Sequence, residues 1–417
     1  MGRTDTGRDE VGAQTGSREP RSAFVALLLL VVGFAAGGCD TAAPRTAVLS
    51  AQQSIDAATF AGLIDRISES GGYFDTDNLI SNETGYLKVM GALAQRGLSG
   101  GAYVGVGPDQ NFSYIAELRP SIVFIVDVRR DNMLHHLLLK ALVEVAPTRV
   151  EFLARLHGVE PPANPEGWEA ASVQEVVDYV DSAWAAAGGG RGAGAEVGRG
   201  PDAGAEVPID GATGLDSRVR ERIESYGVEL TDDDLATIAR FHRTFMAAGP
   251  SLRFTTFGRA PRPYYPTYRQ LVLETDAQGE QASYLATSDR YGVVRELQLA
   301  NRIIPVVGDL AGDHAVAEIG AVLAEMGVEL HAFYASNVEY YLWQGRTFSS
   351  WLDNVRALPA AADAVVIRSY FANFGRAHPS AIPGYYAVQS LHPWDALAAG
   401  DFDSYWDVVT RDVIPLR

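Results

Sequence analysis

The chain has 417 residues, of which 47% are hydrophobic and 21% charged, a composition typical of a packed globular protein rather than a disordered one. Its formal net charge is −18 and its pI is about 4.9, which argues against the basic surface that non-specific nucleic-acid binding requires. A single cysteine excludes an intrachain disulfide framework and a cysteine-rich metal site.

The first 50 residues predict an export signal. The apolar run AFVALLLLVVGFAA, over residues 23–36, has the length of a signal-peptide core and is too short for a comfortable membrane span. It ends in Ala-Gly-Gly-Cys, which resembles a bacterial lipobox with alanine in place of the usual leucine. We therefore predict a signal peptide over 1–39, lipidation of Cys39, a tether over 40–50 and an exported, membrane-anchored lipoprotein. The alternative is an uncleaved anchor or a misassigned start, the latter leaving a cytoplasmic protein.

Residues 51–100 are predicted to form a helical N-terminal segment. Phe60, Leu63, Ile64 and Ile67 have the spacing of one helix face. The stretch GGYFDTDN, over 71–78, interrupts this pattern as a loop, and its carboxylates are candidates for reaching a ligand cleft.

Strands and helices then alternate in two separate stretches, 101–147 and 263–417. The predicted strands lie over 102–106, 122–127, 303–307, 329–334, 364–368 and 386–391. Helices are expected between them, at about 112–118, 132–145, 284–301, 314–326 and 348–358, and at the C-terminus. This alternation predicts an α/β fold with a doubly wound, mainly parallel sheet of the Rossmann-like kind.

Between the two halves lies a predicted helical insertion over 148–262. Its middle, residues 186–214, consists largely of glycine and alanine and cannot bury a core, so we expect a flexible linker there. The helix predicted over 232–247 has a plausible N-cap at Thr231. The Arg-, Pro- and Tyr-rich stretch at 259–266 is either an ordered loop or the wall of a lid.

The strongest local signal is the glycine turn Val104-Gly105-Val106-Gly107, which follows the first strand. In a doubly wound sheet, ligands bind beyond the carboxyl ends of the strands where the strand order reverses. Gly105 and Gly107 would let the backbone approach a ligand there. Asp127 ends the second strand, at the place where a carboxylate commonly accepts both ribose hydroxyls. The structural alternative is a tight turn beside a solvated aspartate.

Four segments together resemble the ordered motifs of class I S-adenosyl-L-methionine (SAM)-dependent methyltransferases. They are Val104-Gly105-Val106-Gly107, Asp127, Val306-Val307-Gly308-Asp309 and Ser336-Asn337-Val338-Glu339-Tyr340. The resemblance covers about 100–146 and 284–391, and the same core resembles an uncharacterised family of bacterial hypothetical proteins.

The methyltransferase resemblance implies a role for each motif. Gly105 and Gly107 would line the methionine and ribose, and Asp127 would hold the ribose. Asp309 would close the third strand near the adenine. Asn337, at the end of the fourth strand, would meet the acceptor together with Tyr340.

Asp109 stands where the methyltransferase family commonly has its third glycine. A carboxylate there disfavours an anionic ligand and tolerates the sulfonium cation of SAM, so Asp109 is included among the candidate cofactor-binding residues. The dinucleotide fingerprint fails at Gln110, although Arg129 and Arg130 would suit a 2′-phosphate. An NAD(P)-binding protein is therefore the less favoured reading.

Asn337 and Tyr340 have the spacing of the Asn-Pro-Pro-Tyr motif of amino-methyltransferases, without either proline. Glu339 would serve as a general base if burial raised its pKa. The alternative is a buried strand end followed by a helix cap. His135 and His136 are adjacent, so we expect one to be buried and the other to be exposed, and no metal site is predicted.

The leading hypothesis is therefore a SAM-binding, methyltransferase-like protein with a small nucleoside-type ligand and an unknown acceptor. The second is a non-catalytic exported lipoprotein that uses the fold as a binding module. Export conflicts with the first hypothesis, because SAM is a cytosolic metabolite. Neither hypothesis includes a metal or a nucleic-acid partner.

Overall fold

The computed structural model describes residues 53–76, 78–189, 215–257, 259, 262–371 and 376–416. The predicted signal peptide, Cys39, the tether and most of the 186–214 linker lie outside these residues. Among the described helices, none is both long and apolar enough to cross a membrane.

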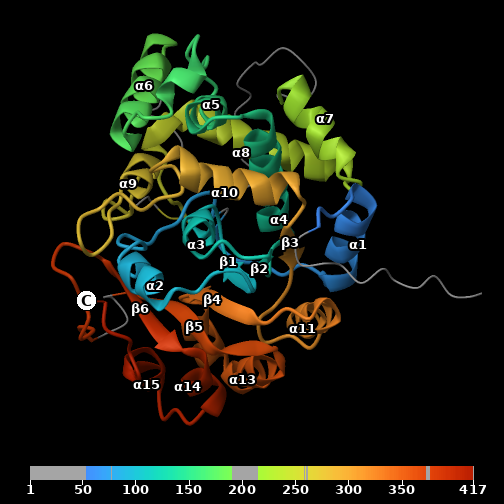
Figure 1. The fold of residues 1–417 in the computed structure, drawn as a ribbon, viewed down its shortest axis with the longest axis vertical. Coiled ribbons are helices and arrows are strands. Elements are labelled where there is room, and N and C mark those ends of the chain that lie inside the picture. Colours follow the sequence, from blue (N-terminus) through green and yellow to red (C-terminus); the bar gives the residue numbers. More distant parts are fainter. Residues whose placement is uncertain are drawn as a thin grey trace, which may run out of the picture. The chain divides into compact units, whose positions relative to one another are not determined.

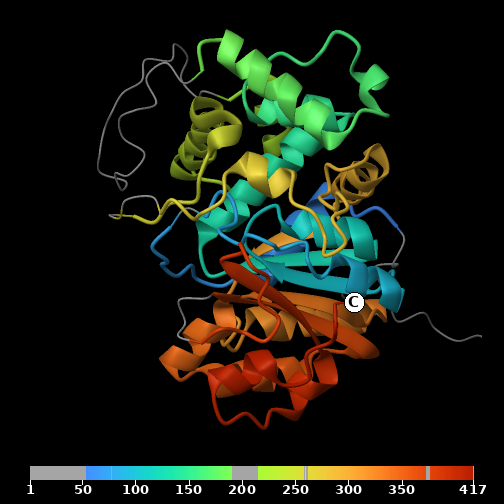
Figure 2. The ribbon, with the colours of Figure 1, turned by 90° about the vertical axis from the view of Figure 1, so that its left-hand side faces the viewer.

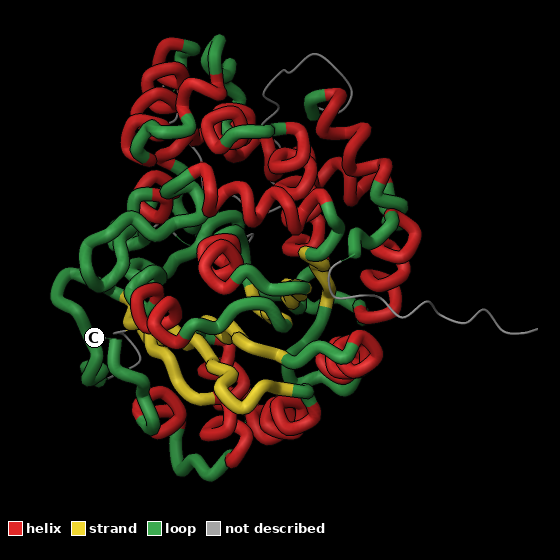
Figure 3. Tube along the Cα trace, in the orientation of Figure 1, coloured by secondary structure: helices red, strands yellow, loops and turns green. Residues whose placement is uncertain are grey.

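Six strands form one sheet (Figures 1 and 3). They are β1 (Ala102–Val106), β2 (Ile122–Asp127), β3 (Ile303–Val307), β4 (Leu330–Ser336), β5 (Ala360–Phe371) and β6 (Ala387–Pro393). Their order is β3-β2-β1-β4-β5-β6, with every neighbouring pair parallel except β5 and β6. The predicted α/β class is confirmed, and the order with its antiparallel last strand is methyltransferase-like.

The strand order reverses between β1 and β4. The chain builds outwards from β1 through β2 to β3 and then returns to place β4 on the other side of β1. The carboxyl ends of β1 and β4 therefore form the switch point, where open α/β sheets bind ligands.

The central strands are buried on both faces. Every residue from Ile122 to Val126 has no exposed surface, and all five residues of β1 are buried. Strands covered by helices on both faces are expected to be continuous apolar runs, which is the pattern of the β2 sequence IVFIVD.

Helices cover both faces of the sheet. Those of the first half and the insertion are α1 (Ala57–Ile67), α2 (Met90–Arg96), α3 (Asn111–Leu118), α4 (Arg130–Val145), α5 (Arg149–Leu156), α6 (Val173–Ala186), α7 (Ser217–Ser225) and α8 (Asp232–Ala248), with short 3₁₀ helices at Pro165–Trp168 and Gly249–Ser251. The rest are α9 (Tyr268–Val272), α10 (Ser288–Leu299), α11 (Ala315–Met326), α12 (Val338–Gly345), α13 (Phe348–Ala357), α14 (Trp394–Ala399) and α15 (Tyr405–Thr410). On one face, α3 and α4 contact the strands and α10 packs across both helices; α11, α13 and α14 cover the other (Figure 2).

The helices of the insertion form a further layer over α4, which contacts α5, α7 and α8 as well as β2 and β3. Because α4 is covered on both sides, His135 and His136 are both 1% exposed, and the expectation that one would lie on the surface was wrong. The predicted cap of α8 is confirmed, since Thr231 Oγ1 accepts from the Asp234 amide and the Asp234 side chain accepts from Thr231 N.

The segment 51–100 is less helical than the sequence indicated. Among the described residues of this segment, only α1 and α2 are α-helices, and the described chain between them is mostly loop, with short turns. In this loop, Ser68 and Glu69 form hydrogen bonds with Val307 at the end of β3, and the Gly72 amide donates to the Val128 carbonyl just after β2. This loop therefore lies at the carboxyl ends of β2 and β3, where the candidate site is expected.

Candidate ligand-binding site

The glycine turn joins β1 to α3 as predicted. Gly107 has a φ of +83°, a conformation that residues with a side chain rarely adopt. The side-chain amide of Asn111 donates to the carbonyls of Val106 (2.9 Å) and Pro108 (2.7 Å) and so holds the turn from within. Nε2 of His136 lies 2.8 Å from the Gly107 carbonyl.

Gly105 is needed for close packing inside the protein. A methyl group at this position would lie 2.0 Å from Asn111 Oδ1 and 2.8 Å from the Tyr103 hydroxyl. That hydroxyl donates to Asn111 Oδ1 at 2.8 Å. The absence of a side chain at 105 therefore makes room for the Asn111 hydrogen bonds that shape the turn.

Asp109, the candidate residue at the third glycine position, is buried beneath two tyrosines. The hydroxyls of Tyr268 and Tyr284 both donate to its Oδ2 at 2.9 Å. Burial raises the pKa of the Asp109 carboxyl to about 6, against the opposing effect of these hydrogen bonds. The contacts explain why an acid is accommodated here, and a contact between Asp109 and a ligand stays a prediction.

Asp127 lies at the end of β2 as predicted, but its carboxylate is held by Arg129. Arg129 Nε and Nη2 donate to the two carboxylate oxygens at 3.0 and 2.6 Å, while Nη1 donates to the Thr76 carbonyl at 2.6 Å. Arg130 forms an ion pair with Asp234 at 2.9 Å. Both arginines that would suit a 2′-phosphate are thus engaged, and a ribose at Asp127 would have to displace Arg129.

The loop 68–76 lies over the carboxyl ends of β2 and β3. The amide of Gly72 donates to the Val128 carbonyl (2.6 Å), and the amide of Glu69 donates to the Val307 carbonyl (3.0 Å). Asp309, exposed just after β3, donates its amide to Glu69 Oε1 (2.6 Å). The loop therefore covers part of the edge where the sequence predicts a nucleoside. Its Asp75 pairs with Arg259 instead, and Asp77 is outside the described residues.

The three candidate catalytic residues follow β4 but do not share one environment. Glu339 is 1% exposed and forms an ion pair with Arg368 (2.5 Å), while Trp351 Nε1 donates to it at 3.1 Å. Asn337 and Tyr340 are half-buried, and the Tyr340 ring packs against Tyr405. Glu339 therefore has the contacts of a buried structural ion pair rather than those of a free base.

A carboxylate that sequence reasoning missed lies at the ends of β4, β5 and β6. Glu83 is 1% exposed and accepts hydrogen bonds from Tyr334, Ser336, Ser369 (2.6 Å) and Gln389 (2.7 Å). Two of these donors are on β4, one is on β5 and one is on β6. Glu83 is in a loop without a periodic pattern, so only the fold brings it to this edge.

Several buried polar atoms in the turn and on α4, which contacts the turn through His136, have no hydrogen-bond partner among the described residues. They are Gln110 Oε1, both amide atoms of Asn132, and His136 Nδ1. These side chains are at most 5% exposed. Burial lowers the pKa of His136 to about 4, so the ring is neutral, and its Nε2 donates to a carbonyl while Nδ1 keeps a lone pair. Buried polar groups are normally satisfied, so this cluster favours a polar ligand or ordered water here.

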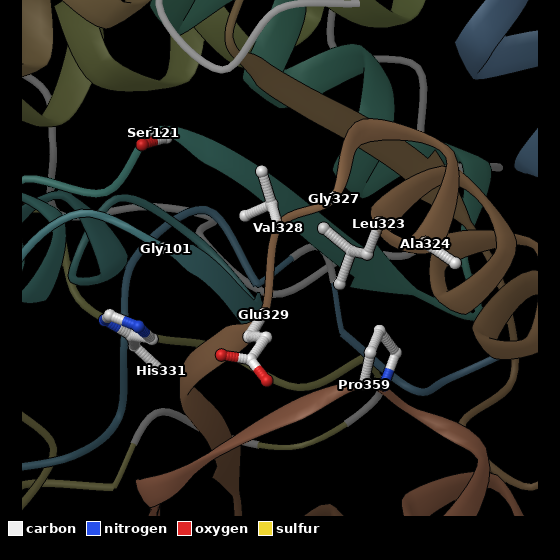
Figure 4. Close-up of a pocket in the computed structure, with 9 residues that line it drawn as sticks. All are labelled: Gly101, Ser121, Leu323, Ala324, Gly327, Val328, Glu329, His331 and Pro359. Atoms are coloured by element: carbon white, nitrogen blue, oxygen red, sulfur yellow. The ribbon is translucent and has the colours of Figure 1, made fainter. Parts of the chain in front are cut away.

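The pocket in Figure 4 lies at the opposite edge of the sheet. Gly101, Ser121, Glu329 and Pro359 line it, and each directly precedes a strand. It is thus at the amino ends of β1, β2, β4 and β5, whereas ligands of open α/β sheets bind at the carboxyl ends. We assign it no function. The described residues contain no group of three or more His, Cys, Asp or Glu arranged to hold a metal.

A comparison with protein families finds one family that matches most of the chain. A family described as a domain of unknown function, DUF7790, matches residues 79–164 and 226–399. The chain belongs to this family. The match includes all six strands, and it leaves out residues 165–225, where the glycine- and alanine-rich linker lies. A comparison with curated proteins finds no match.

Proposed function

We propose that this DUF7790 protein binds a nucleoside-type ligand, S-adenosyl-L-methionine, and that it is methyltransferase-like in activity. The observation that carries the proposal is the set of buried polar atoms of Gln110, Asn132 and His136 that have no partner among the described residues, in and near a positive-φ glycine turn at the switch point. A turn with only a structural role would be expected to satisfy its buried polar neighbours.

Under this proposal, the turn at Gly107 faces the methionine and ribose, and Asp127 accepts the ribose hydroxyls once Arg129 has moved away. Asp309 lies one strand further, on the adenine side. Methyl transfer is a direct displacement in which the protein aligns a nucleophile with the methyl group and excludes water. Asn337 and Tyr340, after β4, are proposed to meet the acceptor.

A second proposal is a non-catalytic binding module, which two contacts favour. Arg129 already neutralises Asp127, and Arg368 already neutralises Glu339. Export through a lipidated Cys39 would fit this second function, because SAM is cytosolic. Membrane fractionation of Cys39→Ala tests the anchor: the variant should lose its membrane association, and unchanged processing and fractionation would rule lipidation out.

Calorimetric titration with SAM and with S-adenosylhomocysteine tests the leading proposal. Wild-type protein should release or take up heat with both ligands, and Asp127→Ala should weaken binding at least about tenfold, because two ribose hydrogen bonds to a charged group are lost. Asp353→Ala, which removes an exposed carboxylate that forms an ion pair with Arg356, is the control and should bind as wild type. No heat from wild-type protein at millimolar ligand would overturn SAM binding.

A further inference from the structure

Glu83 is a buried carboxylate whose hydrogen bonds all come from neutral groups. Its partners are two serines, a tyrosine and a glutamine, and it forms no ion pair with any described residue. Glu144 and Glu339 are buried elsewhere in the fold, and each is paired with a cation, Lys140 and Arg368 respectively. Burying a charge is costly unless it is paired, so the absence of a cation at Glu83 calls for an explanation.

The direction of the hydrogen bonds around Glu83 is fixed by the carboxylate, which can only accept. Tyr334 and Ser369 donate to it, so their oxygens must accept from the next groups outward. Gln389 Nε2 donates to Glu83 and to Ser369 Oγ, both at 2.7 Å, and Gln110 Nε2 lies 3.4 Å from the Tyr334 hydroxyl. Each glutamine is therefore oriented with its NH₂ towards the network.

The carbonyl oxygens of both glutamines are left without a partner. Gln389 is 2% exposed and Gln110 is 5% exposed, and neither Oε1 accepts a hydrogen bond in the described part of the chain. Both amide groups lie within two hydrogen bonds of Glu83 Oε2. The site consequently offers one negative charge and two amide oxygens that accept no hydrogen bond from the described residues.

The Glu83 network lies beside the glycine turn and reaches the surface. Gln110 Nε2 is the atom nearest to the position that a methyl group on Gly107 would occupy, at 3.2 Å. Ser336, which donates to Glu83, is half-buried, so the network reaches the surface at the end of β4. A ligand group bound to this network would thus lie between the proposed nucleoside site and the end of β4.

We propose that Glu83, Gln110 and Gln389 bind a primary ammonium group. Such a group carries one positive charge and three N–H donors, which matches a carboxylate and two amide oxygens. The inference rests on the proposed function in its choice of source: the ammonium belongs either to the amino-acid part of the SAM-type ligand or to a separate amine substrate. In both cases Glu83 supplies the missing ion pair.

Calorimetry with three ligands on wild type and Glu83→Gln distinguishes the sources. S-adenosylhomocysteine carries the ammonium, 5′-methylthioadenosine has the nucleoside without it, and butylammonium has the ammonium alone. If the nucleoside ligand supplies the ammonium group, Glu83→Gln should lower the affinity for S-adenosylhomocysteine by about tenfold to a hundredfold. The affinity for 5′-methylthioadenosine should be unchanged. If a separate amine supplies it, only butylammonium binding should fall.

The controls separate this proposal from the previous one. Butyltrimethylammonium has the charge without N–H donors and should bind less tightly than butylammonium. Glu274→Gln removes a carboxylate that accepts from the Gly85 amide and pairs with Lys88, outside the network, and should change none of the affinities. If Glu83→Gln does not fold, Gln389→Met and Gln110→Met each remove one free acceptor and should weaken the same ligand.

Each outcome has a defined meaning. Binding of butylammonium that depends on Glu83, with no binding of either nucleoside, would support the ammonium site and overturn SAM binding. Equal affinities of every ligand for wild type and Glu83→Gln, or equal competition by sodium or potassium ions, would overturn the ammonium site. Nucleoside binding that depends on Asp127 and not on Glu83, with no amine effect, would leave only the proposed function.

Discussion

At the scale of single residues, the glycine turn combines two requirements. The sequence pattern suggests that Gly105 and Gly107 allow a ligand to approach the backbone, and the positive φ of Gly107 agrees with a conformational need for glycine. Gly105 has an additional cause, since Asn111 occupies the space where its side chain would be. That contact is formed by a residue six positions later, at the start of α3, and the spacing of the motif does not predict it.

We expect Gly105→Ala to destabilise the fold by about 2–3 kcal/mol, because the added methyl group overpacks a buried site. Asn111→Ala should also be destabilising, since it leaves the Tyr103 hydroxyl and two turn carbonyls without their partner. The double variant should cost clearly less than the sum of the two, as chemical denaturation would measure. Strict additivity would show that Asn111 is not what restricts position 105.

At the scale of elements, the strands and the helices between them were predicted closely, and the loop between α1 and α2 was not. The bounds of β1, β2 and β3 agree with the expected ranges because each is an uninterrupted apolar run that is buried on both faces. β5 extends at both ends beyond the predicted 364–368, and its C-terminal part contains two buried polar residues, Arg368 and Ser369. Their burial follows from tertiary partners, the carboxylates of Glu339 and Glu83.

Helix α8 offers a test of local stabilisation that the sequence predicted. Thr231→Ala removes a capping box and should lower the free energy of unfolding by about 1 kcal/mol, whereas Thr231→Ser should retain most of the stability. Thr244→Ala is the matched control, because that hydroxyl is exposed in the helix interior and donates to the Arg240 carbonyl of the same helix. Comparable losses for the two alanine variants would argue against the cap.

At the scale of the whole molecule, two buried histidines and a buried aspartate have opposite effects on the stability of the fold at acidic pH. Burial lowers the pKa of His136 and of His157 from 6.5 to about 4. Each therefore stabilises the fold above pH 6.5, and this contribution, roughly 3 kcal/mol, is lost as the pH falls towards 4. Asp109 has its pKa raised from 3.8 to about 6, so its contribution of similar size grows as the pH falls through the same range.

The net expectation is a loss of stability between pH 6.5 and 4, because two histidines outweigh one aspartate. Asp109→Asn keeps an oxygen for Tyr268 and Tyr284 but cannot gain a proton, so its loss of stability in acid should be steeper than that of wild type. Thermal or chemical unfolding across this range measures both slopes. A shallower slope for Asp109→Asn would contradict the raised pKa.

Sequence alone determined the α/β class, the positions of the strands, the glycine turn and the cap at Thr231. These features depend on local periodicity and on the conformational preferences of single residues, which are encoded within a few positions. The alternation of strands and helices also predicted a mainly parallel sheet, and the structure has one with an antiparallel last strand.

Only the tertiary structure decided which side chains meet at the carboxyl ends of the strands. Arg129 on Asp127 is a contact between near neighbours, but its geometry depends on the loop that supplies the Thr76 carbonyl. Glu83 meets partners more than 250 residues away along the chain. Such contacts arise because the packing of the sheet brings loops that are distant in sequence to the same ends of the strands. A local sequence pattern cannot predict which loops meet there.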